Sequence, residues 1–126
     1  MPPGGDVRKQ KLRFTVAIPI PSQDRAGQPL GKEKIEDWTL RCVEILTNCF
    51  GGATPLPCPS RNRVGDTIIV EKGQMLVMSA CRSREEFRAS EVRIVKFARE
   101  MKEALNQYAV IVLAFPSDTF LVVDQA

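Results

Sequence analysis

The chain has 126 residues, of which 44% are hydrophobic and 26% charged, and it carries a net charge of +3 at pH 7. A chain of this size buries enough apolar surface to fold as one domain without a disulfide or a structural metal. No apolar run approaches the ~20 residues that a membrane helix needs, and the sequence has no histidine, the usual base beside serine and cysteine nucleophiles.

The first residues are polar and contain no segment of signal-peptide type. We therefore expect an intracellular, cytoplasmic protein whose cysteines are reduced. Residues 1–11 include two prolines and two glycines and predict a flexible N-terminal arm. Residues 12–126 predict a single domain.

A strand is predicted over residues 12–20, where apolar side chains alternate with period two at Leu12, Phe14, Val16 and Ile18. Pro19 cannot donate to a sheet, so this end of the strand is expected at an edge or beyond the ladder. A polar loop over residues 22–32 follows. It is long for a compact domain, and loops of this length are often functional or mobile.

Residues 33–50 predict a helix, because their apolar side chains recur at spacings of three and four. The stretch CFGGATPLPCPS follows at residues 49–60 and raises the question of a phosphate-binding loop. Such a loop lies before a helix N-terminus, whereas these glycines come after a helix C-terminus. Gly51 stands where a left-handed helix cap needs glycine, and the prolines stop the helix. The stretch therefore predicts a connector.

Two further strands are predicted over residues 67–70 and 74–81. Glu71-Lys72-Gly73 lies between them and suggests a hairpin turn with glycine at the position of positive φ. Residues 54–66 leave room for one more strand.

A second helix is predicted to begin at Ser83, which forms an S-x-x-E capping box with Glu86, and to end near Asn106. The apolar run AVIVLAF at residues 109–115 predicts a strand buried on both faces. Residues 119–123 predict a short C-terminal strand.

This order of elements predicts a ferredoxin-like α+β fold of βαββαβ type, with two helices on one face of an antiparallel sheet and a short C-terminal strand added. The strands carry more apolar residues than one covered face needs, so we expect a second copy to cover the other face as a homodimer. Residues chosen for that interface are Met75, Met78 and Phe115.

The turn Phe50-Gly51-Gly52-Ala53-Thr54 after the first helix resembles a turn at the same place in small uncharacterised bacterial ferredoxin-like proteins. The resemblance spans residues 12–115. It implies the ferredoxin-like fold and carries no catalytic residue, cofactor or partner.

The candidate site residues form no catalytic set. No C-x-x-C pair is present, Cys42 and Cys49 fall on the apolar stripe of the first helix, and Cys58 is expected to be the exposed thiol. Asp24 and Asp66 are the candidate ligands of a magnesium ion in a nuclease. A basic patch for a phosphate backbone would use Arg8, Lys9, Lys11, Arg13, Arg61 and Arg63.

Taken together, these patterns favour a non-enzymatic interaction or regulatory module that binds another protein and needs no cofactor. Its binding surface would be the open sheet face, an edge strand or the loop of residues 22–32. Two alternatives remain open. One is a nucleic-acid-binding protein that uses the basic patch, and the other is a small metal-dependent nuclease.

Overall fold

The computed structural model describes residues 14–115 and 120–123. Two helices and seven strands lie in these residues. In chain order they are β1 (Phe14–Ile20), α1 (Lys32–Phe50), β2 (Thr54–Pro57), β3 (Ser60–Val64), β4 (Thr67–Glu71), β5 (Met75–Cys81), α2 (Arg84–Ala104), β6 (Val110–Phe115) and β7 (Phe120–Val123).

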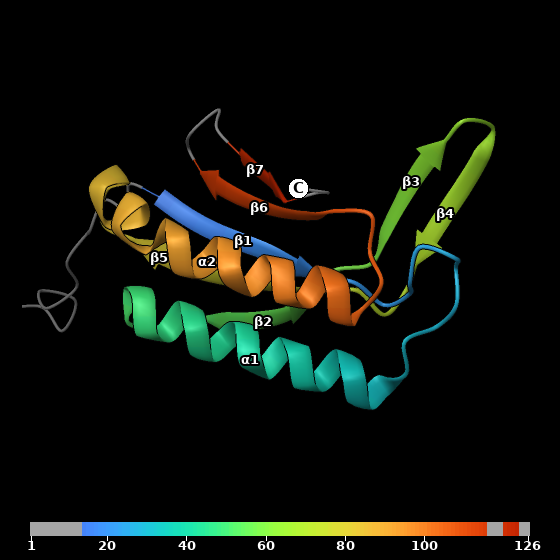
Figure 1. The fold of residues 1–126 in the computed structure, drawn as a ribbon, viewed down its shortest axis with the longest axis horizontal. Coiled ribbons are helices and arrows are strands. Elements are labelled where there is room, and N and C mark those ends of the chain that lie inside the picture. The colour runs from blue at the N-terminus through green and yellow to red at the C-terminus, as the bar shows by residue number, and fades with distance from the viewer. Residues whose placement is uncertain (1–13, 116–119, 124–126) are drawn as a thin grey trace, which may run out of the picture.

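The strands form two sheets. The larger sheet has the order β2-β5-β1-β6-β7 and is antiparallel throughout, and β3 and β4 form a separate two-stranded sheet. Figure 1 shows α1 and α2 side by side on one face of the larger sheet, with the β3–β4 hairpin extending beyond its end. Within the described ranges, no helix is long and apolar enough to cross a membrane.

The core lies between the two helices and the sheet. From β1 it takes the fully buried Val16, Ile18 and Ile20, and Leu46 and Ile94 meet them from α1 and α2. Side chains alternate along a strand, so the three β1 residues point to the helix side of the sheet and their neighbours in β1 point to the other face. Trp38 and Phe97 pack between the helices with ring centroids 5.8 Å apart.

The predicted βαββαβ arrangement is wrong, although the protein is α+β. Four strands lie between the helices rather than two, and β4 pairs with β3 instead of β5. The reason lies in the turns: Gly65 has a φ of 62° and lets Gly65-Asp66 reverse the chain in two residues. The segment Glu71-Lys72-Gly73 instead joins the hairpin to the larger sheet.

Residues 54–57 form an edge strand that the proline-rich sequence concealed. Pro55 and Pro57 lie in β2, which pairs only with β5 and is the outermost strand on its side. An edge strand tolerates proline because one side of it needs no donors. The prolines that stop α1 therefore also fix where this strand can lie.

Both predicted helix boundaries have local causes. Gly51 adopts a φ of 95°, and its N–H donates to the carbonyl of Thr47 at 2.8 Å, so the glycine pair is a helix cap. The hydroxyl of Ser83 accepts from the Glu86 N–H at 3.1 Å, as the capping box predicts. The predicted arm of residues 1–11 lies outside the described residues.

Candidate ligand-binding groove

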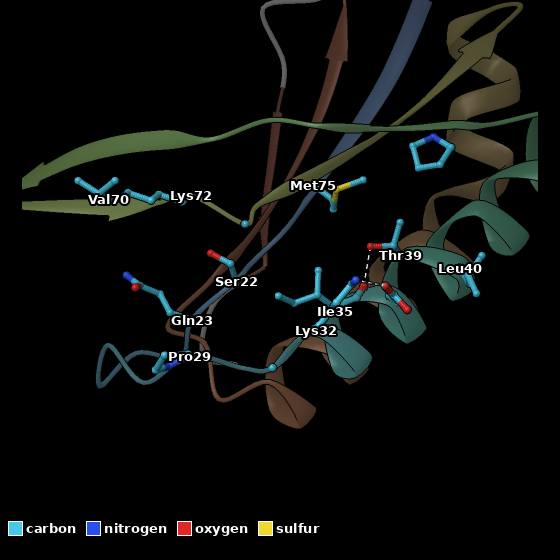
Figure 2. A pocket seen from close by; sticks show the side chains of 14 residues that line it. Ser22, Gln23, Pro29, Lys32, Ile35, Thr39, Leu40, Val70, Lys72 and Met75 are labelled. Atoms are coloured by element: carbon cyan, nitrogen blue, oxygen red, sulfur yellow. Dashed lines mark hydrogen bonds and ion pairs between the residues drawn. The ribbon is translucent and has the colours of Figure 1, made fainter.

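A groove of about 880 Å³ opens at one end of the molecule, beside the N-terminal half of α1 (Figure 2). One side is α1, and the base of the hairpin with the start of β5 forms the side that faces it (Figure 2). The loop after β1, whose residues 22–29 we call the loop wall, closes the end beside the start of α1. Its lining residues are Ser22, Gln23, Pro29, Gly31, Lys32, Ile35, Glu36, Thr39, Leu40, Pro55, Val70, Lys72, Gly73 and Met75.

The interior of the groove is apolar. Ile35 from α1 and Met75 from β5 lie in its middle, and Leu40 and Val70 lie farther out (Figure 2). Gly73 lies directly against the loop wall, since a Cβ on Gly73 would lie 3.3 Å from the Cβ of Ser22. A side chain at residue 73 would therefore press on the loop wall.

Polar groups lie on the loop wall, at the rim and at one point on α1. The Thr39 hydroxyl is buried and donates to the Ile35 carbonyl at 2.6 Å, which leaves its oxygen able to accept a bond. Lys32 and Glu36 form an exposed ion pair at 4.0 Å, and Lys72 is exposed on the opposite side. The rim thus offers both signs of charge around an apolar interior.

Glu71 fastens the loop wall to the base of the hairpin. Its Oε1 accepts from the N–H of Ser22 at 3.1 Å and from the N–H of Gln23 at 3.3 Å. A carboxylate that accepts two backbone donors forms stronger bonds than a neutral acceptor would. The last residue of β4 therefore sets the position of two lining residues that lie 48 and 49 positions earlier in the chain.

The nucleic-acid and metal residues chosen from the sequence are not part of this groove. Arg61 and Arg63 are exposed on β3, and the other four basic residues lie outside the described ranges. Asp24 Oδ1 accepts from Ala26 N at 2.8 Å and from Gln28 N at 2.9 Å, so it shapes the loop. Across residues 14–115 and 120–123, no three ligand-type side chains gather around a possible metal.

The interface residues chosen from the sequence lie on different parts of the sheet. Met75 is in the groove, whereas Met78 pairs with Ala17 on the face away from the helices. Phe115 pairs with Thr15 in the strand register. The face around Met78 also carries Leu56, Leu76, Ile111 and Leu113, and none of these is charged.

The cysteines are all free thiols and stand apart from the groove lining. Burial raises the pKa of the Cys42 thiol to about 12, so it stays protonated at neutral pH. Burial also raises the pKa of Cys81, whose Sγ donates to the Ser83 carbonyl at 3.1 Å. Cys58 is half-buried rather than exposed.

The fold and the groove together define a small α+β protein with a ligand-sized cleft at one end of an antiparallel sheet. Solved structures that share this fold include the following two. A phage S-adenosylmethionine (SAM) lyase in complex with S-methyl-5'-thioadenosine aligns over 95% of both chains, with a TM-score of 0.64 and 12% identity. The apo state of a phage SAM lyase aligns over 94% of this chain and 97% of its own, with a TM-score of 0.61 and 15% identity. No protein-family model and no curated protein matches the sequence.

This comparison overturns the function predicted from the sequence. Both of these structures are of SAM lyases, so the chain shares its fold with enzymes, which conflicts with a non-enzymatic interaction module. It also gives no support to the nucleic-acid and nuclease alternatives. The predicted function was wrong because it relied on the lack of histidines, paired carboxylates and metal ligands in the sequence. The groove contains none of these patterns either.

Sequence reasoning identified one wall of the groove and missed the rest. The length and polarity of residues 22–32 marked that loop as a candidate binding surface. Ile35, Thr39 and Leu40 were hidden because their spacing is that of any amphipathic helix. Only Leu40 stands apart from the buried stripe, with 66% of the residue exposed, and that requires the structure.

Proposed function

We propose that this protein binds S-adenosylmethionine in the groove and cleaves it, releasing S-methyl-5'-thioadenosine. The observation that carries the proposal is the fold likeness to a SAM lyase holding that thioadenosine, which extends over 95% of both chains. The size of the groove supports it, since small-molecule sites enclose roughly 300–1,000 Å³. About 880 Å³ accommodates an adenosine with a short side chain.

The lining has the chemistry that such a ligand needs. A flat adenine suits an apolar interior of the kind made by Ile35, Val70 and Met75. Ribose hydroxyls can bond Ser22 and Gln23 on the loop wall. The amino-acid end of SAM carries both charges, and the rim offers Lys72 to its carboxylate and Glu36 to its ammonium.

The reaction can proceed in this groove without an acid or a base from the protein. Release of the thioadenosine breaks the bond between Cγ and the sulfonium sulfur, and the electron pair goes to sulfur, which becomes a neutral thioether. The carboxylate of the substrate can attack its own Cγ and form a lactone ring, a step that moves no proton. The protein then has to bind the reactive conformer and exclude water, which an apolar groove does.

The test is to incubate the purified chain with SAM and follow S-methyl-5'-thioadenosine by chromatography, and to measure binding of the thioadenosine by calorimetry. Leu40→Arg puts a charge on the apolar wall and should weaken binding by about tenfold or more. Val92→Arg is the matched control, because Val92 is exposed to 80% on α2 and lies outside the groove lining. A wild-type chain that neither cleaves SAM nor binds the thioadenosine would refute the proposal.

We further propose that copies of the chain associate through the sheet face that the helices leave open. That face presents Leu76, Met78 and Leu113 with no charged residue among them, and apolar patches of this kind mark interfaces. A patch without charges is complementary to itself, which suits a symmetric assembly. Met78→Glu should shift sedimentation toward the monomer while Val92→Glu does not. A wild-type chain that sediments as a monomer at high concentration contradicts this.

A further inference from the structure

The loop wall is fastened at a second point, by the segment that follows α2. The Gln107 side chain donates through Nε2 to the Gln23 carbonyl at 2.7 Å and to the Leu105 carbonyl at 3.0 Å. The Arg25 N–H donates to the Asn106 carbonyl at 2.9 Å. The two contacts to the loop wall join parts of the chain more than 80 residues apart, and one of them is made to a lining residue of the groove.

The segment that provides these contacts is itself rigid. The N–H of Gln107 donates to the Lys102 carbonyl at 2.9 Å, and Asn106 has a φ of 50°. This pattern is a Schellman cap, in which a residue in the left-handed conformation ends the helix and the next N–H donates to a carbonyl five residues earlier. Leu105 beside it is 1% exposed and belongs to the core. Gln107 is therefore positioned by the helix end and the core.

The loop wall is braced by hydrogen bonds of its own, so the position of its fastening points matters. Asp24 bonds Ala26 and Gln28 internally, and Gln23 bridges Pro29 across the loop. A turn braced in this way transmits a shift at Gln23 to the whole wall. Gln107 and Glu71 both hold it at one residue, since Gln107 is bonded to the carbonyl of Gln23 and Glu71 to its N–H.

We propose that Gln107 is a positioning residue for ligand binding: it fixes the position of the loop wall at the end of the groove, and hence the space left for the ligand, without touching the ligand. This inference rests on the proposed function for its ligand. A wall that contacts the ligand equally in the ground state and the transition state contributes uniform binding, so loss of Gln107 should raise KM and leave kcat within about twofold.

The experiment compares Gln107→Ala, Gln107→Glu and the control Asn48→Ala, which removes an exposed amide far from the groove lining. For Gln107→Ala we expect a rise of about fivefold in KM for SAM and in Kd for S-methyl-5'-thioadenosine, the factor for one lost hydrogen bond. Gln107→Glu keeps the shape but places a carboxylate against the Gln23 carbonyl, so its effect should be at least as large. Asn48→Ala should leave both constants unchanged.

Amide hydrogen exchange provides a readout that needs no ligand. Exchange at residues 23–28 should be faster by about fivefold in both Gln107 variants, because the wall opens more often when one fastening bond is lost. Wild-type behaviour of Gln107→Glu in binding and exchange would overturn the inference, as would a fall in kcat alone. If the wild-type chain neither binds nor cleaves, the proposed function fails by itself, and the exchange rates alone decide the role of Gln107.

Discussion

The helix wall of the groove, which is the part of α1 from Lys32 to Leu40, and the loop wall at its end are held by different forces. Toward the core, α1 buries Trp38, Cys42 and Leu46 over its length, so its position comes from apolar burial shared among many contacts. The loop wall is largely exposed and takes its position from a few hydrogen bonds to Glu71, Gln107 and Asn106. One wall can therefore be moved only by damaging the core, whereas the other can be moved by single polar substitutions.

The largest effect on stability should come from the buried stripe of α1. Leu46→Ala removes a side chain with no exposed surface and should lower the free energy of unfolding by about 3 kcal/mol. Leu40→Ala is the matched control on the same helix, because Leu40 is 66% exposed and its loss should cost below about 0.5 kcal/mol. Chemical denaturation of the two variants checks the pair. Equal losses would mean that α1 is not held by its buried stripe.

Cys42, which lies on the buried stripe of α1, provides a pH-dependent test of how that stripe is buried. Its pKa is raised by burial from 9.0 to about 12 in the folded chain, so the folded state holds the proton more tightly than the unfolded state. Its contribution is fully present below pH 9 and is lost as the pH rises toward 12. Stability should fall by up to about 1.4 kcal/mol per pH unit in that window. Denaturation curves at pH 8 and 10 for wild type and Cys42→Ala separate this from other groups, because the variant should lack this part of the fall.

The sequence predicts a region well where local signals determine its structure, and poorly where contacts distant in sequence do. The periodic stripes of α1 and α2, the Gly51 cap and the Ser83 capping box are local signals, and the structure has them where the sequence places them. The β3–β4 hairpin was missed because Ser60–Val64 carries no apolar alternation: its side chains are half-buried or exposed. The predicted pairing of β4 with β5 was wrong because two segments, Gly65-Asp66 and Glu71-Lys72-Gly73, can each form a hairpin turn. Their composition does not show which of the two does so.

The groove could not be predicted because it is made by contacts that are distant in sequence. Glu71 to Ser22 and Gln107 to Gln23 join residues 49 and 84 positions apart. Neither pair forms a recognisable spacing, and each residue alone resembles an ordinary surface side chain. A search for catalytic residue types also finds nothing in a site whose proposed reaction uses the carboxylate of its own substrate.

The smallest effect on stability, with a clear effect on binding, should come from Glu71→Ala. The substitution leaves the N–H groups of Ser22 and Gln23 without their carboxylate acceptor, but both lie on a partly exposed loop where water can replace it. We therefore expect the free energy of unfolding to fall by about 1 kcal/mol or less, and Kd for S-methyl-5'-thioadenosine to rise by about tenfold. Glu44→Ala, an exposed carboxylate on α1 outside the groove lining, is the control.

Combining Glu71→Ala with Gln107→Ala tests whether the loop wall is one unit. If both residues hold the same wall, the second substitution acts on a wall already displaced, so the rise in Kd for the pair should be smaller than the product of the single rises. Calorimetric titration of the four chains in this cycle measures the coupling. Independent effects that multiply would mean that each residue acts on its own part of the groove. The two bonds to Gln23, one on its N–H and one on its carbonyl, would then not constrain a common position.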